Sequence, residues 1–210
     1  MAAARIHPGA VICDWDHMVI TLRDGGGSGP ETGFLSLYAI TYSASLGAGH
    51  VALFEVPAAP EGRRAMTLSD SDGLGRRMQA RLRSMGFDRP CLAGAPVVAR
   101  FEREPFVGGG FGFRILADDL DIRARWEEAS PPFWFDGQGG AFSQDEDIWA
   151  MMVGARRASL TVNGVTAPGE PFDDDVWVPK LGRSLSSAHA AFAEIRVEPV
   201  SGRATGSGSA

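Results

Sequence analysis

Three consecutive aspartates lie between two large aromatic residues in the stretch EPFDDDVWVPK, which runs from Glu170 to Lys180. Phe172 precedes the aspartates, and Trp177 follows them after one valine. One interpretation is a solvated acidic loop that follows Pro171. The other is a proton donor, because neighbouring carboxylates and apolar walls favour the neutral form of an acid at pH 7. On a strand, Asp174 would point away from the two aspartates that flank it, which makes it the candidate acid.

A second cluster, CDWDHM, begins at Cys13 and could place an acid and an imidazole side by side. If the segment is a strand, Asp14 and Asp16 lie on the face of the apolar residues that follow, and His17 lies on the other. Carboxylates on a core-facing side are costly unless they are paired or used. The alternative is a strand that begins near His17, with both aspartates in a loop. Asp16 and His17 are therefore candidate catalytic residues, of which only one could enter a cavity.

The histidines and cysteines do not have the spacing of a metal site. Neither HxH nor HExxH occurs, and the two cysteines form no CxxC pair, so we expect no metal. A disulfide between the cysteines stays open. No GxSxG motif occurs, and the glycine-rich GGGFGF leads into a strand instead of a helix, which argues against nucleotide binding. The residues concerned are His7, His17, His50, His189, Cys13, Cys91 and Gly108 to Phe113.

Aromatic residues are concentrated in one part of the chain. Trp126, Trp134 and Trp149 lie within 24 residues, together with the turn-rich stretch PPFWF. This cluster is either core or the rim of a pocket for a hydrophobic ligand. Tyr38 and His50, on two other predicted strands, are further candidates for ligand contact.

Most of the chain alternates apolar and polar residues with a period of two, which is typical of half-buried antiparallel strands. In one such segment Leu120, Ile122, Ala124 and Trp126 face one way, and Asp121, Arg123 and Arg125 face the other. The predicted strands are Val11 to Leu22, Phe34 to Ser45, His50 to Val56, Val97 to Arg103, Gly110 to Ala117, Leu120 to Trp126, Ile148 to Arg156, Ala158 to Val162 and Ala190 to Val197.

Two local signals interrupt or connect these strands. From Ser71 to Met85, apolar residues recur every three or four positions, which predicts an amphipathic helix with a solvated arginine face that plugs the barrel. An arginine-rich helix that binds an anionic surface is the alternative. Asn163-Gly164 predicts a hairpin, because a type I′ turn needs positive φ at both central residues. The stretch FDGQGG from Phe135 to Gly140 is expected to be a loop.

So many strands with one helix predict an all-β fold, either a closed or nearly closed antiparallel barrel or a sandwich. Closure removes exposed strand edges, and a barrel of about eight strands can hold one small ligand. We expect one domain over residues 1–200 and a disordered tail over 201–210, where SGRATGSGSA is small and polar.

Composition excludes some partners. The net charge is −6, so we expect no nucleic-acid partner. No apolar run approaches the length of a membrane span, and no secretory leader is apparent, which favours a cytoplasmic protein. A homodimer stays open.

Two stretches resemble the carotenoid 1,2-hydratase (hydroxyneurosporene synthase) family and its AttH-like relatives. GHVALFEVPAAPEGRRAMTLSD from Gly49 is similar to a strand and its return, and VNGVTAPGEPFDDDVW carries an aromatic–x–Asp–x–x–Trp motif. Phe172, Asp174 and Trp177 match that motif, with phenylalanine where the family usually has tyrosine. The resemblance covers about a third of the chain. It implies a lipocalin-like β-barrel, no metal or organic cofactor, a hydrophobic substrate, and an aspartate that protonates an alkene.

Two classes of function stay open, with a variant of the first. The first is a cofactor-free lyase, hydratase, cyclase or isomerase acting on a terpenoid, polyketide or aromatic molecule by acid–base chemistry. The second is a carrier of a hydrophobic ligand without chemistry. The variant is a decarboxylase in which an inward arginine, Arg100 or Arg114, holds a substrate carboxylate. An ionisable side chain inside the cavity would distinguish an enzyme from a carrier, and Glu55 joins the residues above as a candidate.

Overall fold

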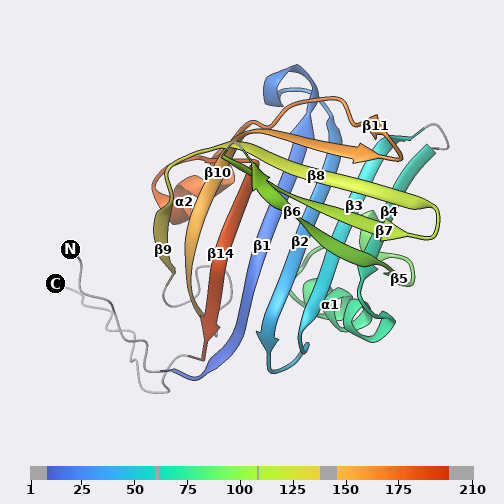
Figure 1. Cartoon of the computed structure of the whole chain (residues 1–210). Coiled ribbons are helices and arrows are strands. Elements are labelled where there is room, and N and C mark those ends of the chain that lie inside the picture. Colours follow the sequence, from blue (N-terminus) through green and yellow to red (C-terminus); the bar gives the residue numbers. More distant parts are fainter. Residues whose placement is uncertain (1–8, 60–61, 108, 138–145, 199–210) are drawn as a thin grey trace.

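The protein is mainly antiparallel β-sheet with two short helices, as the period-two pattern predicts (Figure 1). The computed structural model describes residues 9–59, 62–107, 109–137 and 146–198, so the predicted tail lies outside the described residues. The main sheet contains β1 (Val11–Arg23), β2 (Glu31–Ser43), β3 (Gly49–Ala59), β4 (Gly62–Ser69), β5 (Val97–Val98), β6 (Arg100–Val107), β7 (Gly110–Ala117), β8 (Leu120–Ala129), β9 (Phe133–Gly137), β10 (Asp147–Val162), β11 (Val165–Thr166) and β14 (Ala188–Val197). The other elements are α1 (Asp72–Ser84), α2 (Val178–Leu181), the two-stranded sheet of β12 (Asp173–Asp174) and β13 (Leu185–Ser186), and the 3₁₀ turns η1 (Asp24–Gly27), η2 (Pro90–Leu92) and η3 (Asp175–Trp177).

The main sheet curls into a nearly closed, lipocalin-like barrel. Its order is β5-β4-β3-β2-β1-β14-β10-β8-β7-β6. The first half of β10 pairs with β14 and the second half pairs with β8, so this one strand carries the sheet from one layer to the other. The two ends of the order are joined by the chain itself, because β5 pairs with β4 and continues into β6. The Ala99 amide between them donates to the Ser69 carbonyl oxygen at 2.8 Å.

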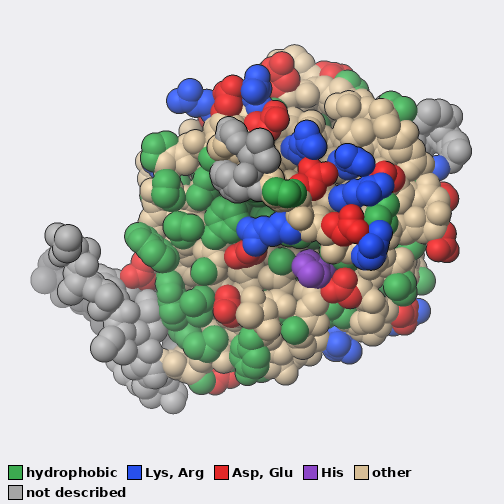
Figure 2. Space-filling model, in the orientation of Figure 1, with side chains coloured by type: hydrophobic (Ala, Val, Ile, Leu, Met, Phe, Trp, Pro, Cys, Tyr) green, Lys and Arg blue, Asp and Glu red, His purple; other side chains and the backbone are tan. Residues whose placement is uncertain are grey.

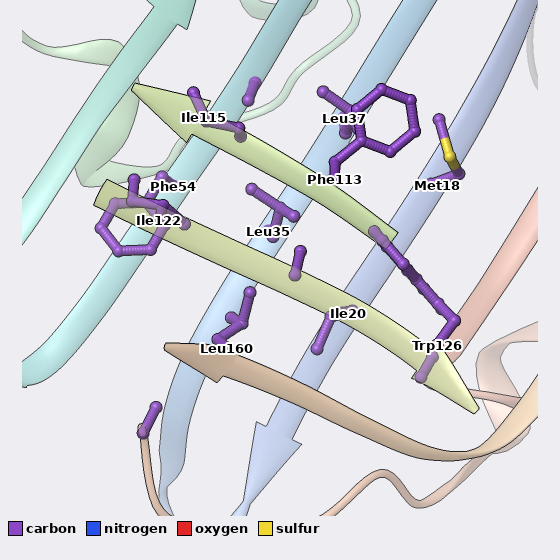
Figure 3. Close-up of a cluster of buried hydrophobic side chains, with 14 of the residues drawn as sticks. Met18, Ile20, Leu35, Leu37, Phe54, Phe113, Ile115, Ile122, Trp126 and Leu160 are labelled. Carbon is purple, nitrogen blue, oxygen red and sulfur yellow. The ribbon is translucent and has the colours of Figure 1, made fainter. Parts of the chain in front are cut away.

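The barrel interior is a packed hydrophobic core. In Figure 3 the side chains of β7 and β8 lie over those of β1, β2 and β3, with Leu160 of β10 beside them. The Trp126 side chain is fully buried there, and its indole N–H donates to the Val19 carbonyl oxygen at 2.8 Å. Large apolar side chains of the described residues occupy this interior, which argues against the expectation that the barrel holds a ligand inside.

The predicted helix is confirmed to within one residue at each end. Ser71 caps it, since its hydroxyl accepts from the Leu74 amide at 3.3 Å. It does not plug the barrel, however. Leu74, Met78 and Leu82 pack on Val51 and Leu53, on the sheet face opposite the barrel core. The periodicity predicted the buried side of the helix, whereas the surface that receives it depends on the curl of the sheet.

Several local predictions can be compared with the structure. Asn163 and Gly164 have φ of 49° and 83° and connect β10 to β11, which confirms the hairpin. The two strands predicted between residues 148 and 162 are one continuous strand, β10. The expected loop at Phe135 to Gly140 is wrong in its first part, because β9 extends to Gly137 and pairs with β10. Cys13 and Cys91 are both buried and free, so no disulfide joins them.

The outer face of β6, β7 and β8 is a ladder of opposite charges. Figure 2 shows arginines interleaved with acidic side chains over this part of the molecule. Arg114 pairs with Asp121 at 2.7 Å, and Arg125 pairs with Glu104 at 3.1 Å. Arg100 is 70 % exposed and pairs with Glu102. Neither Arg100 nor Arg114 points inward, so the expectation of an inward arginine at those positions is wrong.

Within the described part of the chain, no helix is long and apolar enough to cross a membrane.

Candidate functional site

A pocket of about 340 Å³ lies on the sheet face opposite the barrel core. Its floor is formed by strands β10, β14, β1 and β2. One wall is α1 with Met78, Leu82 and Met85, and the other is β9 with the segment from β12 to α2. Most of its lining is apolar, and its volume lies in the range of small-molecule sites. The packing of α1 on the outside of the sheet therefore forms one wall of a cavity that lies outside the barrel core.

His17 of β1 lies in the middle of the pocket floor. Its Nε2 is 2.9 Å from the Ser36 hydroxyl, and its ring stacks on Tyr38 with 4.2 Å between centroids. Its Nδ1 is 4.0 Å from a Glu194 carboxylate oxygen. Burial, helped by the charges of His189 and Arg196, lowers the pKa of His17 to about 3, so the ring is neutral at pH 7.

Tyr38 of β2 supplies a hydroxyl group that keeps its proton. Burial raises its pKa to about 12, and a hydrogen bond with Ser36 opposes that shift only in part. The ring is also in edge contact with Trp15, at 5.3 Å between centroids. Ser36, Tyr38 and His17 thus form one connected, uncharged group of hydrogen-bonding side chains in the pocket.

His189 of β14 lies toward the end of the pocket formed by η3. Its Nδ1 is 2.8 Å from the Ser186 carbonyl oxygen, and a carbonyl can only accept, so Nδ1 carries the proton. Nε2 is then the acceptor nitrogen of the ring. Burial lowers the pKa of His189 to about 4, although the Asp174 carboxylate opposes that shift. Trp177 meets the ring edge-on at 5.2 Å. A neutral imidazole with a free lone pair is the form that can accept a proton.

A chain of four charged side chains closes the opposite end of the pocket. Arg81 donates to one Glu146 oxygen at 2.9 Å, and Arg196 donates to the other at 2.8 Å. Arg196 also donates through Nε to Glu194 at 3.0 Å. Burial alone would raise the pKa of Glu146, but the hydrogen bonds from both arginines outweigh it and hold that pKa below its usual value. The guanidinium groups of Arg196 and Arg81 also lie 5.0 Å and 6.0 Å from the ring centroid of Trp15.

A β-bulge in β14 places both ends of this site on one face. His189 and Ala191 line the pocket, and after an extra residue so do Glu194 and Arg196. The bulge includes Ala193, whose φ is 49°. The Ala193 amide donates to the Asp16 carboxylate at 3.0 Å. Bulges commonly re-aim side chains near functional sites.

Asp16 therefore has a supporting position and does not line the pocket. It points to the other side of β1, where it also pairs with Arg103 at 3.7 Å. The strand begins at Val11, so neither aspartate of the CDWDHM cluster is in a loop. As the alternation implied, only one of Asp16 and His17 enters the cavity, and it is His17.

The three-aspartate run forms the rim of the pocket and the start of a short helical segment. Asp174 is the N-cap of η3, where its side chain accepts from the Val176 amide at 3.1 Å, and Asp175 lies in the first turn. Negative charge at that position suits the dipole of a helical turn. Asp174 and Trp177 both line the pocket. Phe172 does not line it, because it lies under the Arg23 guanidinium at 4.4 Å, against Gly27.

The structure does not bring the other candidate ligand contacts to this pocket. Trp126 is in the barrel core, Trp134 is 72 % exposed on β9, and Trp149 points to the other face of β10. His50 pairs with Asp70 at 3.0 Å and stacks on Phe101. Glu55 is buried on β3, where it accepts from Arg89 and from the Cys91 amide. Of the predicted residues, the pocket thus contains His17, Tyr38, Asp174 and Trp177.

The sequence reasoning missed the role of the charged chain and of His189. Glu194 and Arg196 do stand out as charges on an apolar strand, AFAEIRV, and inward charges on a strand need partners. Arg81, which is linked to them through Glu146, is separated from them by more than half of the chain, so no local pattern connects these charges. Among the described residues, no group of three or more histidine, cysteine, aspartate or glutamate side chains could hold a metal ion.

Comparisons with known proteins add little to this geometry. No family model matches the chain, and no curated protein matches it. Among solved structures, it is similar to an acetoacetate decarboxylase from Legionella pneumophila, at 10 % identity and a TM-score of 0.43, with 95 % of this chain and 90 % of that chain covered. The description of the site therefore depends on the residues themselves.

Acidification should destabilise the fold through the two buried imidazoles. Both have folded pKa values, about 3 for His17 and about 4 for His189, below the 6.5 of a free side chain. At a pH between the folded pKa of a ring and 6.5, the unfolded chain binds more protons than the folded chain. The free energy of unfolding therefore falls as pH falls, by up to about 1.4 kcal/mol per pH unit for each ring. Urea denaturation between about pH 7 and pH 5 measures this. The double variant His17→Gln/His189→Asn should show a shallower dependence, and a flat wild-type profile would contradict the prediction.

Proposed function

We propose that this protein is an enzyme, a cofactor-independent lyase or isomerase that acts on a hydrophobic small molecule by acid–base chemistry. The observation that carries the proposal is His189, a neutral imidazole in an apolar pocket whose Nδ1 proton is committed to Ser186. A carrier needs only apolar walls, whereas an imidazole in the pocket supplies a group that can take up a proton. Strongly perturbed titratable groups in a cavity are typical of functional sites.

Each of these residues has a separate role in the proposed reaction. His189 accepts a proton through Nε2 from a carbon next to a carbonyl or hydroxyl-bearing carbon of the substrate. Ser36, Tyr38 and His17 supply hydrogen bonds to the oxygen on which negative charge develops, and Tyr38 keeps its proton for that purpose. Trp177 and the apolar walls position the substrate and exclude water.

Asp174 is the second acid–base candidate in this proposal. The resemblance to the carotenoid hydratases implies that it donates a proton, and it lines the same pocket as His189. Removal of a proton by His189, transfer of that proton from the imidazolium to the Asp174 carboxylate, and its return from Asp174 to another carbon of the substrate would complete an isomerisation. Addition or loss of water after the same proton transfer would give a hydratase or its reverse.

Deuterium exchange tests the proposed function without a known substrate. The protein is incubated in D₂O with uncharged terpenoid, polyketide and aromatic ketones and alcohols, and each compound is followed by mass spectrometry. We expect protein-dependent uptake of deuterium, or gain or loss of one water, for at least one compound that binds. Compounds that bind stoichiometrically with no exchange and no product would instead show a carrier.

Replacement of Asp174 by asparagine should lower turnover by about 10² without loss of the fold. Asparagine has nearly the same shape and is an equally good N-cap, so its side-chain oxygen can still accept from the Val176 amide. Turnover of the compound found above and far-UV circular dichroism are the measurements. Asp173→Asn and Asp175→Asn are matched controls with much smaller expected effects. Equal turnover in Asp174→Asn and wild type would remove Asp174 from the mechanism.

A further inference from the structure

We propose that the pocket selects an uncharged ligand, a largely apolar molecule whose buried end carries a hydroxyl or carbonyl group and no ionised group. This inference rests on the proposed function, which takes this pocket as the substrate site, and adds the chemical class of the substrate. It is carried by the chain of charges at the closed end of the pocket, described above.

The positive charges that line this end already have partners. Two arginines, Arg81 and Arg196, alternate with two glutamates, Glu146 and Glu194, so the four charges sum to zero. Arg196 uses both Nε and Nη1 for these contacts. A ligand carboxylate would therefore add a negative charge beside arginines whose charge the two glutamates already compensate.

The chain is also poorly hydrated, which strengthens this exclusion. The side chains of Arg196, Glu194 and Glu146 are exposed by only 9 %, 10 % and 12 %. An anion that enters such an environment loses its hydration and gains no uncompensated positive charge in return. The two imidazoles of the pocket do not change this balance, because both are neutral at pH 7.

The middle of the pocket suits a neutral oxygen instead. Ser36, Tyr38 and His17 are connected, uncharged donors and acceptors on one face of β1 and β2. Hydroxyl and imidazole groups can form hydrogen bonds with a carbonyl or hydroxyl oxygen, and such a ligand brings no net charge into the pocket. Lys180 is exposed at the opposite end of the pocket, where its Nζ lies 5.6 Å from the ring centroid of Trp177.

The test compares two probes of the same shape, 2-acetylnaphthalene and 2-naphthoate, by titration calorimetry and tryptophan fluorescence at about pH 7.5. Wild-type protein should bind the ketone at least about tenfold more tightly than the carboxylate. Glu146→Gln keeps the size of the side chain but leaves one arginine charge uncompensated. This variant should bind the carboxylate at least about tenfold more tightly than wild type does. Glu102→Gln, on the outer face of β6, is the control and should leave both affinities unchanged.

Each possible result of this test supports or overturns the inference, the proposed function, or both. Preference of the wild type for the carboxylate, or an unchanged preference in a folded Glu146→Gln, overturns the inference. If Glu146→Gln does not fold, Glu194→Gln replaces it, and the wild-type preference still counts. Absence of binding by either probe overturns the inference and also contradicts the choice of this pocket. Preference for the ketone without any exchange activity leaves the inference standing and refutes the proposed enzyme. Turnover of an anionic compound would support the proposed enzyme and overturn this inference.

Discussion

Replacement of His189 by asparagine should lower turnover by at least about 10², while the affinity for ligand stays within about threefold of wild type. Asparagine can place an amide N–H close to the position of Nδ1, so the hydrogen bond to the Ser186 carbonyl oxygen can be kept. The acceptor nitrogen Nε2 is lost, and with it the proposed base. Removal of a positioned general base typically costs 10² to 10⁴ in rate. Turnover is measured by the deuterium-exchange assay, and affinity by titration calorimetry.

Two further variants make the test of His189 specific. His50→Asn changes an imidazole that pairs with Asp70 outside the pocket, so turnover should be unchanged. His17→Gln keeps an amide near the Nε2 position that contacts Ser36, so it should weaken binding of the substrate oxygen more than it alters the pH profile. If His189→Asn turns over as fast as wild type, the base is another group and the proposed division of work is wrong.

Replacement of Trp126 by alanine should destabilise the fold by about 3–5 kcal/mol, the typical cost of deleting a fully buried large aromatic side chain. Trp126 has no exposed surface, stacks on Phe111 at 5.0 Å, and donates a hydrogen bond to the Val19 carbonyl oxygen. The substitution opens a cavity between the two layers and leaves that carbonyl without its donor. The measurement is the free energy of unfolding from urea denaturation monitored by circular dichroism.

Trp134→Ala is the matched control. This side chain is 72 % exposed on β9, and exposed positions away from special contacts usually change stability by less than about 0.5 kcal/mol. The comparison also separates two interpretations of the tryptophan cluster, as core or as a ligand rim. If Trp126→Ala left stability unchanged but abolished ligand binding, the packed barrel interior described above would be wrong.

The local pattern of the sequence was sufficient to predict the elements and the sides of the elements that are buried. Leu120, Ile122, Ala124 and Trp126 face the core, and the charged residues between them face solvent. Such patterns succeed because residues two apart on a strand, or three to four apart on a helix, share one environment. The same reasoning correctly separated Asp16 from His17. It failed at β9, where glycine and aspartate suggested a loop but pairing with β10 decided the conformation.

The run of three aspartates shows where such patterns reach their limit. The aromatic residues around it suggested a common apolar frame for one acid. In the structure Phe172 packs away from the pocket, Trp177 packs into it, and Asp174 caps a helical turn between them. The direction of Trp177 depends on η3, which begins at Asp175 and gives the residues after Asp174 a helical instead of a strand conformation. Whether Asp174 also transfers a proton is a question for the Asp174→Asn variant.

The sequence by itself determined an all-β fold with one amphipathic helix, because alternation and helical periodicity depend only on neighbours along the chain. The tertiary structure alone decided where the pocket lies. The barrel interior is filled by side chains from eight strands, and the pocket lies on the opposite face, under α1 and beside α2. It also decided the composition of the site, since Arg81, Glu146 and Arg196 come from α1, the position just before β10 and the end of β14. A β-bulge at Ala193 sets the side of the sheet on which Glu194 and Arg196 lie, and a bulge depends on hydrogen bonds between strands that no single strand encodes.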